Sequence, residues 1–300
     1  MFSIDSQNIG QNFRPYIIAE LSANHGGSIQ RAKLSILAAK NAGVNAIKIQ
    51  SYTPETMTID CDKENFKIKE GLWKGYNLYQ LYTESFTPFE WHKELFNFAY
   101  NIGITIFSSA FDETAVDLLE TLNVPAYKIA SFELTDIDLI KYIAKKNKPM
   151  LISTGMGSID EINDAVNAVK SYGNDKILLL HCISSYPAAT ESSHLNNIKI
   201  LADQFNVLVG LSDHTLNNLA ATLSIALGAV VIEKHFKLDD DECGADSSFS
   251  LLPTELSNLV NDCNNAWLAL GKNKFERDDL ELINKQFRRS LYFVKDCKVG

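Results

Sequence analysis

The feature that most constrains the fold is a set of eight short apolar runs, rich in β-branched residues, with amphipathic segments between them. Most of these runs are continuously hydrophobic, which is typical of parallel strands that are buried on both faces. Strands that alternate with helices in this way predict an α/β protein with a parallel sheet. The eight runs are 16–22, 45–51, 104–109, 126–131, 149–154, 177–182, 207–212 and 230–235.

Eight successive βα units favour a closed (β/α)8 TIM barrel over the alternative, an open doubly wound sheet. The open sheet would normally carry a glycine-rich phosphate loop after its first strand, and SANHGGS at 22–28 lacks the G-x-G-x-x-G pattern. The length of 300 residues also suits the barrel, which typically needs about 250.

The segments between the strands show helical periodicity, and several of them end on glycine, the usual residue at a helix C-terminus. Thr87-Pro88, Ser158 and Thr215 are predicted helix starts, because these residue types favour the first positions of a helix. The predicted helical segments are 28–43, 88–103, 112–123, 136–147, 158–173, 216–228 and 253–271.

One connection is much longer than the others and one terminal segment departs from the barrel pattern. Loops that follow barrel strands lie on the catalytic face, so the long connection, 52–86, is predicted to cover a substrate. After Gly271 the sequence is strongly charged, and SLYFVKDCKVG then resembles the start of a new strand. We therefore predict a barrel domain at 1–275, followed at 276–300 by a linker and the truncated start of a C-terminal module.

Composition excludes several classes of partner. The net charge of −9 argues against nucleic acid, which requires a basic face. No apolar run approaches the roughly 20 residues that a membrane-spanning helix needs, so no membrane partner is expected. The cysteines are odd in number and scattered, which favours free thiols in a reducing cytoplasm. They are Cys61, Cys182, Cys243, Cys263 and Cys297.

Polar residues stand at the predicted carboxyl end of every strand, where catalytic groups of a TIM barrel lie. Lys48 and Lys128 interrupt apolar strands, where an unpaired ammonium would be costly. They could bind a phosphate together with nearby hydroxyl groups, or act as Schiff-base nucleophiles. The other strand-end candidates include Glu20, Asn24, His25, Gln50, Ser108, Ser109, Ser131, Glu133, Ser153, Thr154, Ser184, Ser185, Tyr186, Ser212, Asp213 and Asp246.

His214 and His235 end adjacent strands, so their imidazoles can converge on a metal ion, with Glu20 opposite. Two imidazoles completed by oxygen ligands would suit Mn²⁺ or Mg²⁺. His181 lies one position deeper in its strand and is interpreted as a supporting residue. His92 and His194 are predicted to be solvated on helical surfaces.

At these positions the sequence resembles the sialic acid synthase family. The matching motifs, in order, are IAELSANHGG, AIKIQSYTP, FSSAFDETAVDLLE, PAYKIASFELTD, ISTGM, CISSYP, GLSDHT, IEKHF and GADSSFSL. They extend from about residue 16 to residue 271 and include every strand end. Finer details, such as ASFELTD and GLWKGYNLYQLY, are most similar to the pseudaminic acid synthase branch.

The resemblance implies the condensation of phosphoenolpyruvate with the open-chain aldehyde of an N-acetylated amino sugar, which gives a nine-carbon 2-keto acid and phosphate. It implies that Glu20 acts on the attacking water and that His214 and His235 bind the metal. Glu133, Tyr186 and Asp246 would hold the sugar. The implied phosphoenolpyruvate ligands are Lys48, Ser109, Lys128, Ser131, Ser153, Ser184 and Ser212.

Several alternatives stay open at the level of sequence. The favoured sugar is 2,4-diacetamido-2,4,6-trideoxy-L-altrose, to which Phe132 and Phe249 would offer apolar contact. N-acetylneuraminic or legionaminic acid synthesis is the alternative within the family. A Schiff-base aldolase and a catalytically silent barrel are the rivals outside it. The C-terminal module of the family is antifreeze-like (SAF), and it completes the active site of a partner in a homodimer of the full-length form.

Overall fold

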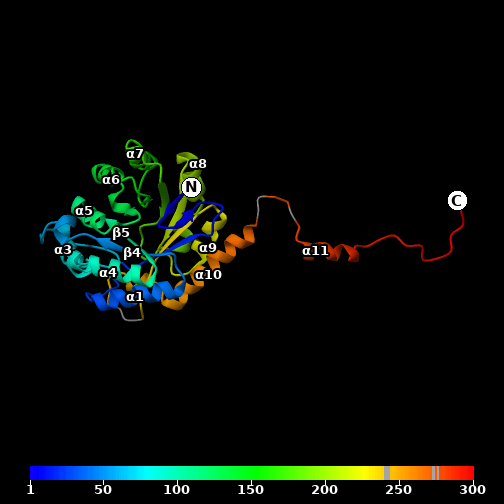
Figure 1. Cartoon of the computed structure of the whole chain (residues 1–300), viewed down its shortest axis with the longest axis horizontal. Coiled ribbons are helices and arrows are strands. Elements are labelled where there is room, and N and C mark those ends of the chain that lie inside the picture. The colour runs from blue at the N-terminus through cyan, green and yellow to red at the C-terminus, as the bar shows by residue number, and fades with distance from the viewer. Residues whose placement is uncertain (240–243, 272–273, 276) are drawn as a thin grey trace.

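The computed structural model describes residues 1–239, 244–271, 274–275 and 277–300. Eight parallel strands form a closed barrel in the order β10-β3-β4-β5-β6-β7-β8-β9, so the predicted TIM barrel is confirmed (Figure 1). The strands are β3 (Tyr16–Glu20), β4 (Ala46–Ser51), β5 (Thr105–Ala110), β6 (Tyr127–Ile129), β7 (Met150–Ser153), β8 (Ile177–Cys182), β9 (Leu208–Asp213) and β10 (Val231–His235).

Helices pack around the outside of this barrel and bury their apolar faces against the strands. One of them, α8, is absent from the predicted set, although its side chains Ile198, Leu201 and Phe205 follow helical spacing and are buried. The outer helices are α1 (Ile29–Ala42), α4 (Phe89–Ile102), α5 (Glu113–Thr121), α6 (Ile137–Ala144), α7 (Ile159–Lys170), α8 (Asn196–Phe205), α9 (Leu219–Ala226) and α10 (Pro253–Leu270).

Local capping residues explain most of the helix boundaries. Ser158 caps the start of α7 as predicted, in a capping box in which the Ser158 backbone N–H donates to the Glu161 carboxylate at 2.7 Å. Gly43 ends α1 in the left-handed conformation at φ 89°, which favours glycine. The predicted helix start at Thr215 is wrong, because α9 begins at Leu219 and Thr215 instead hydrogen-bonds to Asp213.

An antiparallel hairpin that the sequence did not predict precedes the barrel, formed by β1 (Phe2–Ile4) and β2 (Gln7–Ile9). Its position is fixed by side-chain hydrogen bonds near the amino ends of two strands. The Asn45 amide lies 2.6 Å from Gln7, and the Thr105 hydroxyl lies 3.1 Å from Asp5. The hairpin therefore covers the end of the barrel opposite to the predicted site.

The long connection 52–86 contains short helices, α2 (Pro54–Met57), η1 (Glu64–Phe66) and α3 (Leu78–Ser85). The ring of Tyr82 packs edge-on against Tyr52, at the end of β4, with 5.7 Å between centroids. This contact holds α3 near the carboxyl end of the barrel. Further single-turn helices, η2 (Ser131–Glu133), η3 (Thr190–Ser192) and η4 (Ser247–Phe249), lie in the loops at the same end.

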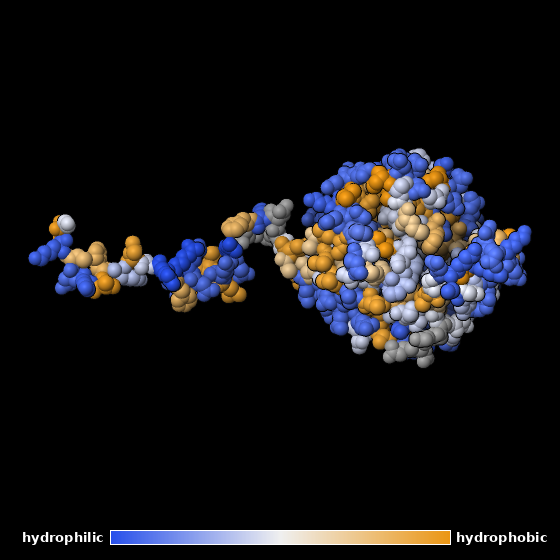
Figure 2. Space-filling view, turned by 180° about the vertical axis from the view of Figure 1, so that it is seen from behind, coloured by the Kyte–Doolittle hydropathy of each residue, from blue (hydrophilic) through white to orange (hydrophobic). Residues whose placement is uncertain are grey.

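After α10 the chain leads away from the barrel through α11 (Asp279–Ile283) and η5 (Asn284–Phe287) (Figure 1). Apolar side chains on this segment are exposed, Phe287 at 75% and Phe293 at 89%. Figure 2 shows hydrophobic and hydrophilic residues interspersed along the extended terminal segment. Four cysteines are free, whereas Cys243 lies outside the described residues. Within the described ranges, no helix combines the length and the apolar character that a membrane crossing requires.

Candidate active site

The strand register gathers the candidate residues at one end of the barrel. Glu20 stands opposite both Lys48 and His235 in the neighbouring strands. Side chains on a strand alternate between its two faces, so residues two apart, such as Glu233 and His235, share one. The buried polar side chains that result are Glu20, Lys48, Ser109, Lys128, Ser131, Ser153, Ser212, His214, Glu233, His235 and Asp246.

The two predicted lysines converge on one buried carboxylate. Lys48 Nζ lies 2.5 Å from Glu20 and 3.7 Å from Glu233, and it also donates to Ser109 at 3.0 Å. Lys128 Nζ lies 3.9 Å from Glu233 and donates to Ser153 at 2.7 Å. The lysines are thus paired within the barrel, which explains why they can be 3% and 2% exposed.

Burial and these neighbours move the pKa values in different directions. Burial raises the pKa of Glu20, against the attraction of Lys48. Burial acts to lower the pKa of Lys48, but Glu20 and Glu233 outweigh it, so the net shift is upward. Burial lowers the pKa of Lys128, which Glu233 offsets only in part. For Glu233, burial is outweighed by Lys128 and Lys48, and the pKa is lowered.

Glu233 is the main residue of the site that sequence reasoning missed. It accepts a hydrogen bond from Ser212 at 3.0 Å and is 4% exposed. A signal was present, because a glutamate two positions before His235 in an apolar strand must face the barrel interior with it. Its charge offsets part of the charge of the two lysines, so we include it among the site residues.

Hydroxyl groups form one wall beside the lysines. Ser131, at the start of η2, accepts a hydrogen bond from the Gly155 backbone at 3.1 Å. A Cβ at Gly155 would lie 2.3 Å from Ser184 Oγ and 2.7 Å from Ser131 Oγ, so only glycine fits where these hydroxyls approach the backbone. Ser131 and Ser184 therefore lie close together beside Gly155, and Ser153 lies against Lys128.

His214 and His235 also come together as predicted, with 5.3 Å between ring centroids. His214 Nδ1 lies 2.9 Å from the Ile183 carbonyl, an interaction that leaves Nε2 available as a ligand. His235 Nδ1 is buried and makes no hydrogen bond within the described part of the chain, and Asp246 lies 3.5 Å from it. The two imidazoles suit a divalent ion whose remaining ligands are oxygen atoms.

The chain supplies few further ligands for such an ion. Among the described residues, no group of three or more His, Cys, Asp or Glu side chains is arranged to hold a metal. Oxygen atoms from water or substrate would have to complete the coordination, which is usual for Mg²⁺ and for catalytic sites.

A hydrogen-bonded chain connects Glu20 to the histidine side of the site. The Gln50 amide donates to Glu20 at 3.1 Å and to Ser22 Oγ at 2.9 Å, and Ser22 in turn donates to Asp246. Ser22 adopts a left-handed conformation at φ 46°, which is uncommon for a residue other than glycine. Backbone strain of this kind often occurs at functional sites, and here it places the Ser22 hydroxyl between Gln50 and Asp246.

Aromatic side chains lie beside the two imidazoles. Tyr186 packs on His214 at 4.4 Å between centroids, and Phe249 packs on His235 at 4.8 Å. Trp73, from the long connection, lies 5.5 Å from Tyr186 and donates from Nε1 to the Ala245 carbonyl at 2.9 Å. The connection therefore reaches over the mouth of the barrel.

Glu133 and Phe132, both on η2, occupy different environments. Glu133 Oε2 is buried without a hydrogen-bond partner among the described residues, and burial raises the pKa of this carboxyl to about 7. Phe132 is 66% exposed, whereas Phe249 is 1% exposed. Phe249 therefore contacts the histidines directly, and Phe132 faces solvent at the rim.

The other histidines show one correction. His92 is wrongly predicted to be solvated: it is completely buried, and Ser51 lies 2.6 Å from its Nε2. The ring lies between Ser51 on β4 and the Pro88 carbonyl, and burial lowers its pKa to about 4. His194 is exposed as predicted. His181 is buried, with Nε2 2.7 Å from the Ser193 carbonyl, and it faces away from the lysines.

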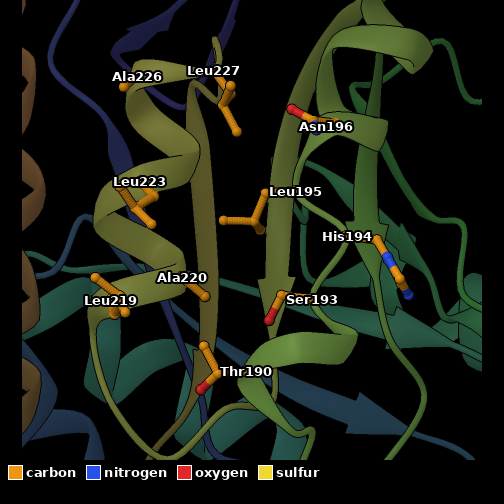
Figure 3. Close-up of a pocket in the computed structure, with 10 residues that line it drawn as sticks. All are labelled: Thr190, Ser193, His194, Leu195, Asn196, Leu219, Ala220, Leu223, Ala226 and Leu227. Atoms are coloured by element: carbon orange, nitrogen blue, oxygen red, sulfur yellow. The ribbon is translucent and has the colours of Figure 1, made fainter.

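A separate cavity of about 380 Å³ lies between α8 and α9, outside the barrel. Figure 3 shows Leu195 on one wall and Leu219 and Leu223 on the other. It contains none of the predicted catalytic groups, so it is distinct from the site at the barrel mouth.

Comparison with known proteins shows the family of the chain. Residues 35–275 match the model of the NeuB family. The chain is 46% identical to the pseudaminic acid synthase of Campylobacter jejuni, over 98% of this chain and 85% of that protein. It is 41% identical to the pseudaminic acid synthase of Helicobacter pylori, over 95% and 84%.

Two further comparisons give the range of the similarity. The N,N'-diacetyllegionaminic acid synthase of Legionella pneumophila is 36% identical, over 97% of this chain and 83% of that protein. The crystal structure of an N-acetylneuraminic acid synthetase from Leptospira borgpetersenii superposes with a TM-score of 0.85 at 29% identity, covering 97% of this chain and 96% of that one.

Proposed function

The chain belongs to the NeuB family, and on that premise we propose that it catalyses the pseudaminic acid synthase reaction. In this reaction phosphoenolpyruvate condenses with 2,4-diacetamido-2,4,6-trideoxy-L-altrose to give a nine-carbon 2-keto sugar acid and phosphate. The pseudaminic acid synthases are more similar in sequence to this chain than the legionaminic acid synthase is, at 41–46% against 36% identity. This order favours the pseudaminic precursor as the sugar.

One observation carries the proposal: Lys48 and Lys128 converge on a single buried point inside the barrel. Two ammonium groups fixed in a region of low dielectric attract a dianionic phosphate strongly. Glu233 lies between them and, together with Glu20, offsets their charge. The phosphate would be bound by Lys48, Ser109, Lys128, Ser131, Ser153, Ser184 and Ser212.

The carbon–carbon bond forms when the enol carbon of phosphoenolpyruvate attacks the aldehyde carbon of the sugar. Water then adds to the neighbouring carbon, and the carbon–oxygen bond to phosphate breaks. Glu20 is proposed to accept the proton of this water. Its raised pKa, caused first by burial, makes the carboxylate a better base.

His214, His235 and the adjacent Asp246 are proposed to face the aldehyde oxygen. Mn²⁺ or Mg²⁺, bound by the two imidazoles, would polarise this oxygen as negative charge develops on it. The contact of Tyr186 with His214 limits the access of water to this side. Tyr186, Asp246 and Glu133 are proposed to hold the sugar.

The experiment is to incubate the protein with phosphoenolpyruvate, Mn²⁺ and each of three sugars, and to measure released phosphate. The sugars are the altrose derivative, N-acetylmannosamine and the legionaminic precursor. Release should require both substrates and be fastest with the altrose derivative. If no phosphate is released with any of the three sugars, a catalytically silent barrel is favoured. A preference for another sugar would reassign the substrate.

A Schiff-base aldolase is the second candidate, because burial lowers the pKa of Lys128 and a neutral amine is the nucleophile in that chemistry. Borohydride would trap such an adduct on Lys128 or Lys48. The main proposal predicts no trapped adduct.

The proposal extends to the rest of the chain. Residues 1–275 form the catalytic domain, the connection 52–86 covers the substrate, and 276–300 form a linker and the start of a C-terminal module. The exposed apolar side chains of this last segment support the start of such a module, since they need a partner surface. A cytoplasmic location and a homodimer belong to the proposal through the family resemblance alone.

A further inference from the structure

Lys234 is completely buried, yet it points away from the catalytic interior. It stands on β10 between Glu233 and His235, which face inward, so its own side chain faces the helical layer. In register it lies opposite Asp213, the last residue of β9. Lys234 directly precedes His235, one of the two proposed metal ligands. Asp213, which lies opposite Lys234, directly precedes the other ligand, His214.

The ammonium of Lys234 hydrogen-bonds to several groups of the turn that follows β9. Nζ lies 2.6 Å from Asp213 Oδ2, 2.6 Å from the Thr215 carbonyl and 2.9 Å from the Asn217 carbonyl. A lysine has three hydrogens to donate, and these three short contacts use all of them. Asp213 also accepts from the Thr215 backbone at 2.9 Å, which closes the turn on itself.

His214 lies inside this turn and is oriented from the other side by the loop after β8. Its carbonyl accepts a hydrogen bond from the Ala188 backbone at 2.9 Å, and its Nδ1 lies 2.9 Å from the Ile183 carbonyl. The ring orientation is thus set by the Ile183 carbonyl. The His214 backbone is held on one side by Ala188 and on the other by the turn around Lys234.

We propose that Lys234 is a positioning residue that fixes the 213–217 turn and thereby sets the spacing of His214 and His235 for metal binding. The carboxylate and two turn carbonyls converge on one buried point, and only a side chain with three donors satisfies them together. An apolar residue of equal length would leave all three acceptors unsatisfied, and the turn would open to hydrate them. The inference rests on the proposed metal site.

Metal binding is the quantity to measure, because residues that support metal ligands typically change affinity by about 10–100-fold. The test variant is Lys234→Met, which keeps the chain length and removes the donors. A second variant, Lys234→Met with Asp213→Asn, also removes the charge that the first leaves unpaired. Lys148→Met is the matched control, since Lys148 forms an ion pair of the same length, 2.6 Å, with Glu120 outside the site.

Free Mn²⁺ would be followed by electron paramagnetic resonance and phosphoenolpyruvate binding by calorimetry, with circular dichroism to check the fold. We expect the Mn²⁺ dissociation constant to rise at least tenfold in both variants, while that of phosphoenolpyruvate stays within twofold. Lys148→Met should change neither constant.

Three results would overturn the inference: an unchanged Mn²⁺ constant in a folded variant, equal weakening of Mn²⁺ and phosphoenolpyruvate, or loss of the fold in both variants. The last two would assign Lys234 to general stability. If wild type binds Mn²⁺ and releases phosphate, and the variants have the same Mn²⁺ dissociation constant as wild type, only this inference fails. If wild type binds no Mn²⁺, the proposed metal site itself fails.

Discussion

Glu233 and Lys48 face each other inside the barrel, with Oε2 3.7 Å from Nζ and both side chains almost completely buried. The same carboxylate faces Lys128 from β6 at 3.9 Å. Without a bound anion, Glu233 is therefore the charge that both lysines share. Because the same charges act in both, the effect of an anionic substrate on the thermal stability of the barrel reports on its binding.

Glu233→Gln should destabilise the protein and make it more dependent on substrate. Breaking a buried ion pair typically costs about 3–5 kcal/mol, because the remaining charge is uncompensated. Phosphoenolpyruvate would supply the missing negative charge, so it should raise the melting temperature more in the variant than in wild type. Thermal unfolding with and without phosphoenolpyruvate checks this. Glu120→Gln, at a partly exposed ion pair, is the control. An equal ligand shift in both proteins would contradict the shared-charge interpretation.

Removal of divalent metal should abolish phosphate release, and added Mn²⁺ should restore it. His235→Asn should raise the Mn²⁺ concentration for half-maximal rate by about 10–100-fold, since one ligand is weakened. His194→Asn is the control, because His194 is an exposed histidine outside the site. The rate is measured against Mn²⁺ concentration after dialysis with chelator. Full activity after dialysis would argue against a metal site.

Glu133 should make stability depend on pH. Burial raises its pKa to about 7 from the ordinary 4.5, so the folded state binds this proton more tightly than the unfolded state. Its contribution to stability is therefore present below pH 4.5 and is lost as the pH rises to about 7. The loss is at most about 3 kcal/mol.

Glu133→Gln should consequently be more stable than wild type at pH 8 and equal to it near pH 4. It should also be less active if the carboxylate holds the sugar, a trade-off that is common at functional sites. Urea unfolding at the two pH values measures the difference, with the exposed Glu70→Gln as control. The same stability difference at both pH values would refute the buried-carboxyl interpretation.

Trp73→Ala should weaken sugar binding selectively. The indole packs on Tyr186 and is held by the Ala245 carbonyl, so its loss opens the wall beside the proposed sugar position. An aromatic contact of this kind is worth about 1 kcal/mol beyond its buried area, so the KM for the sugar should rise about fivefold. The KM for phosphoenolpyruvate should stay constant. Trp267→Ala, on α10, is the control, and equal changes in both KM values would count against the proposal.

The barrel could be predicted from sequence because each strand is a continuous apolar run that only a parallel sheet covered on both faces can bury. The site followed from it, because the carboxyl ends of barrel strands meet in one place. Lys48, Lys128, His214 and His235 were found in this way. Their polar character in apolar strands marked them as functional.

The residues that were missed depend on partners distant in the sequence. His92 reads as an amphipathic surface position, and only the packing of α4 over Ser51 shows that it is buried. Glu233 was missed although it lies two positions before His235 and therefore shares its strand face, because the adjacent charged residue Lys234 obscures this pattern. The N-terminal hairpin strands are three residues each, too short for a periodic pattern.

The fate of the bridging oxygen of phosphoenolpyruvate tests the central claim most directly. Phosphoenolpyruvate carrying ¹⁸O at that oxygen is incubated with the altrose derivative, Mn²⁺ and the protein, and both products are analysed by mass spectrometry. Carbon–oxygen cleavage predicts that the label appears in phosphate, released in equal amount with the nine-carbon acid. Label retained in the organic product, or phosphate released without the sugar, would contradict the proposed condensation.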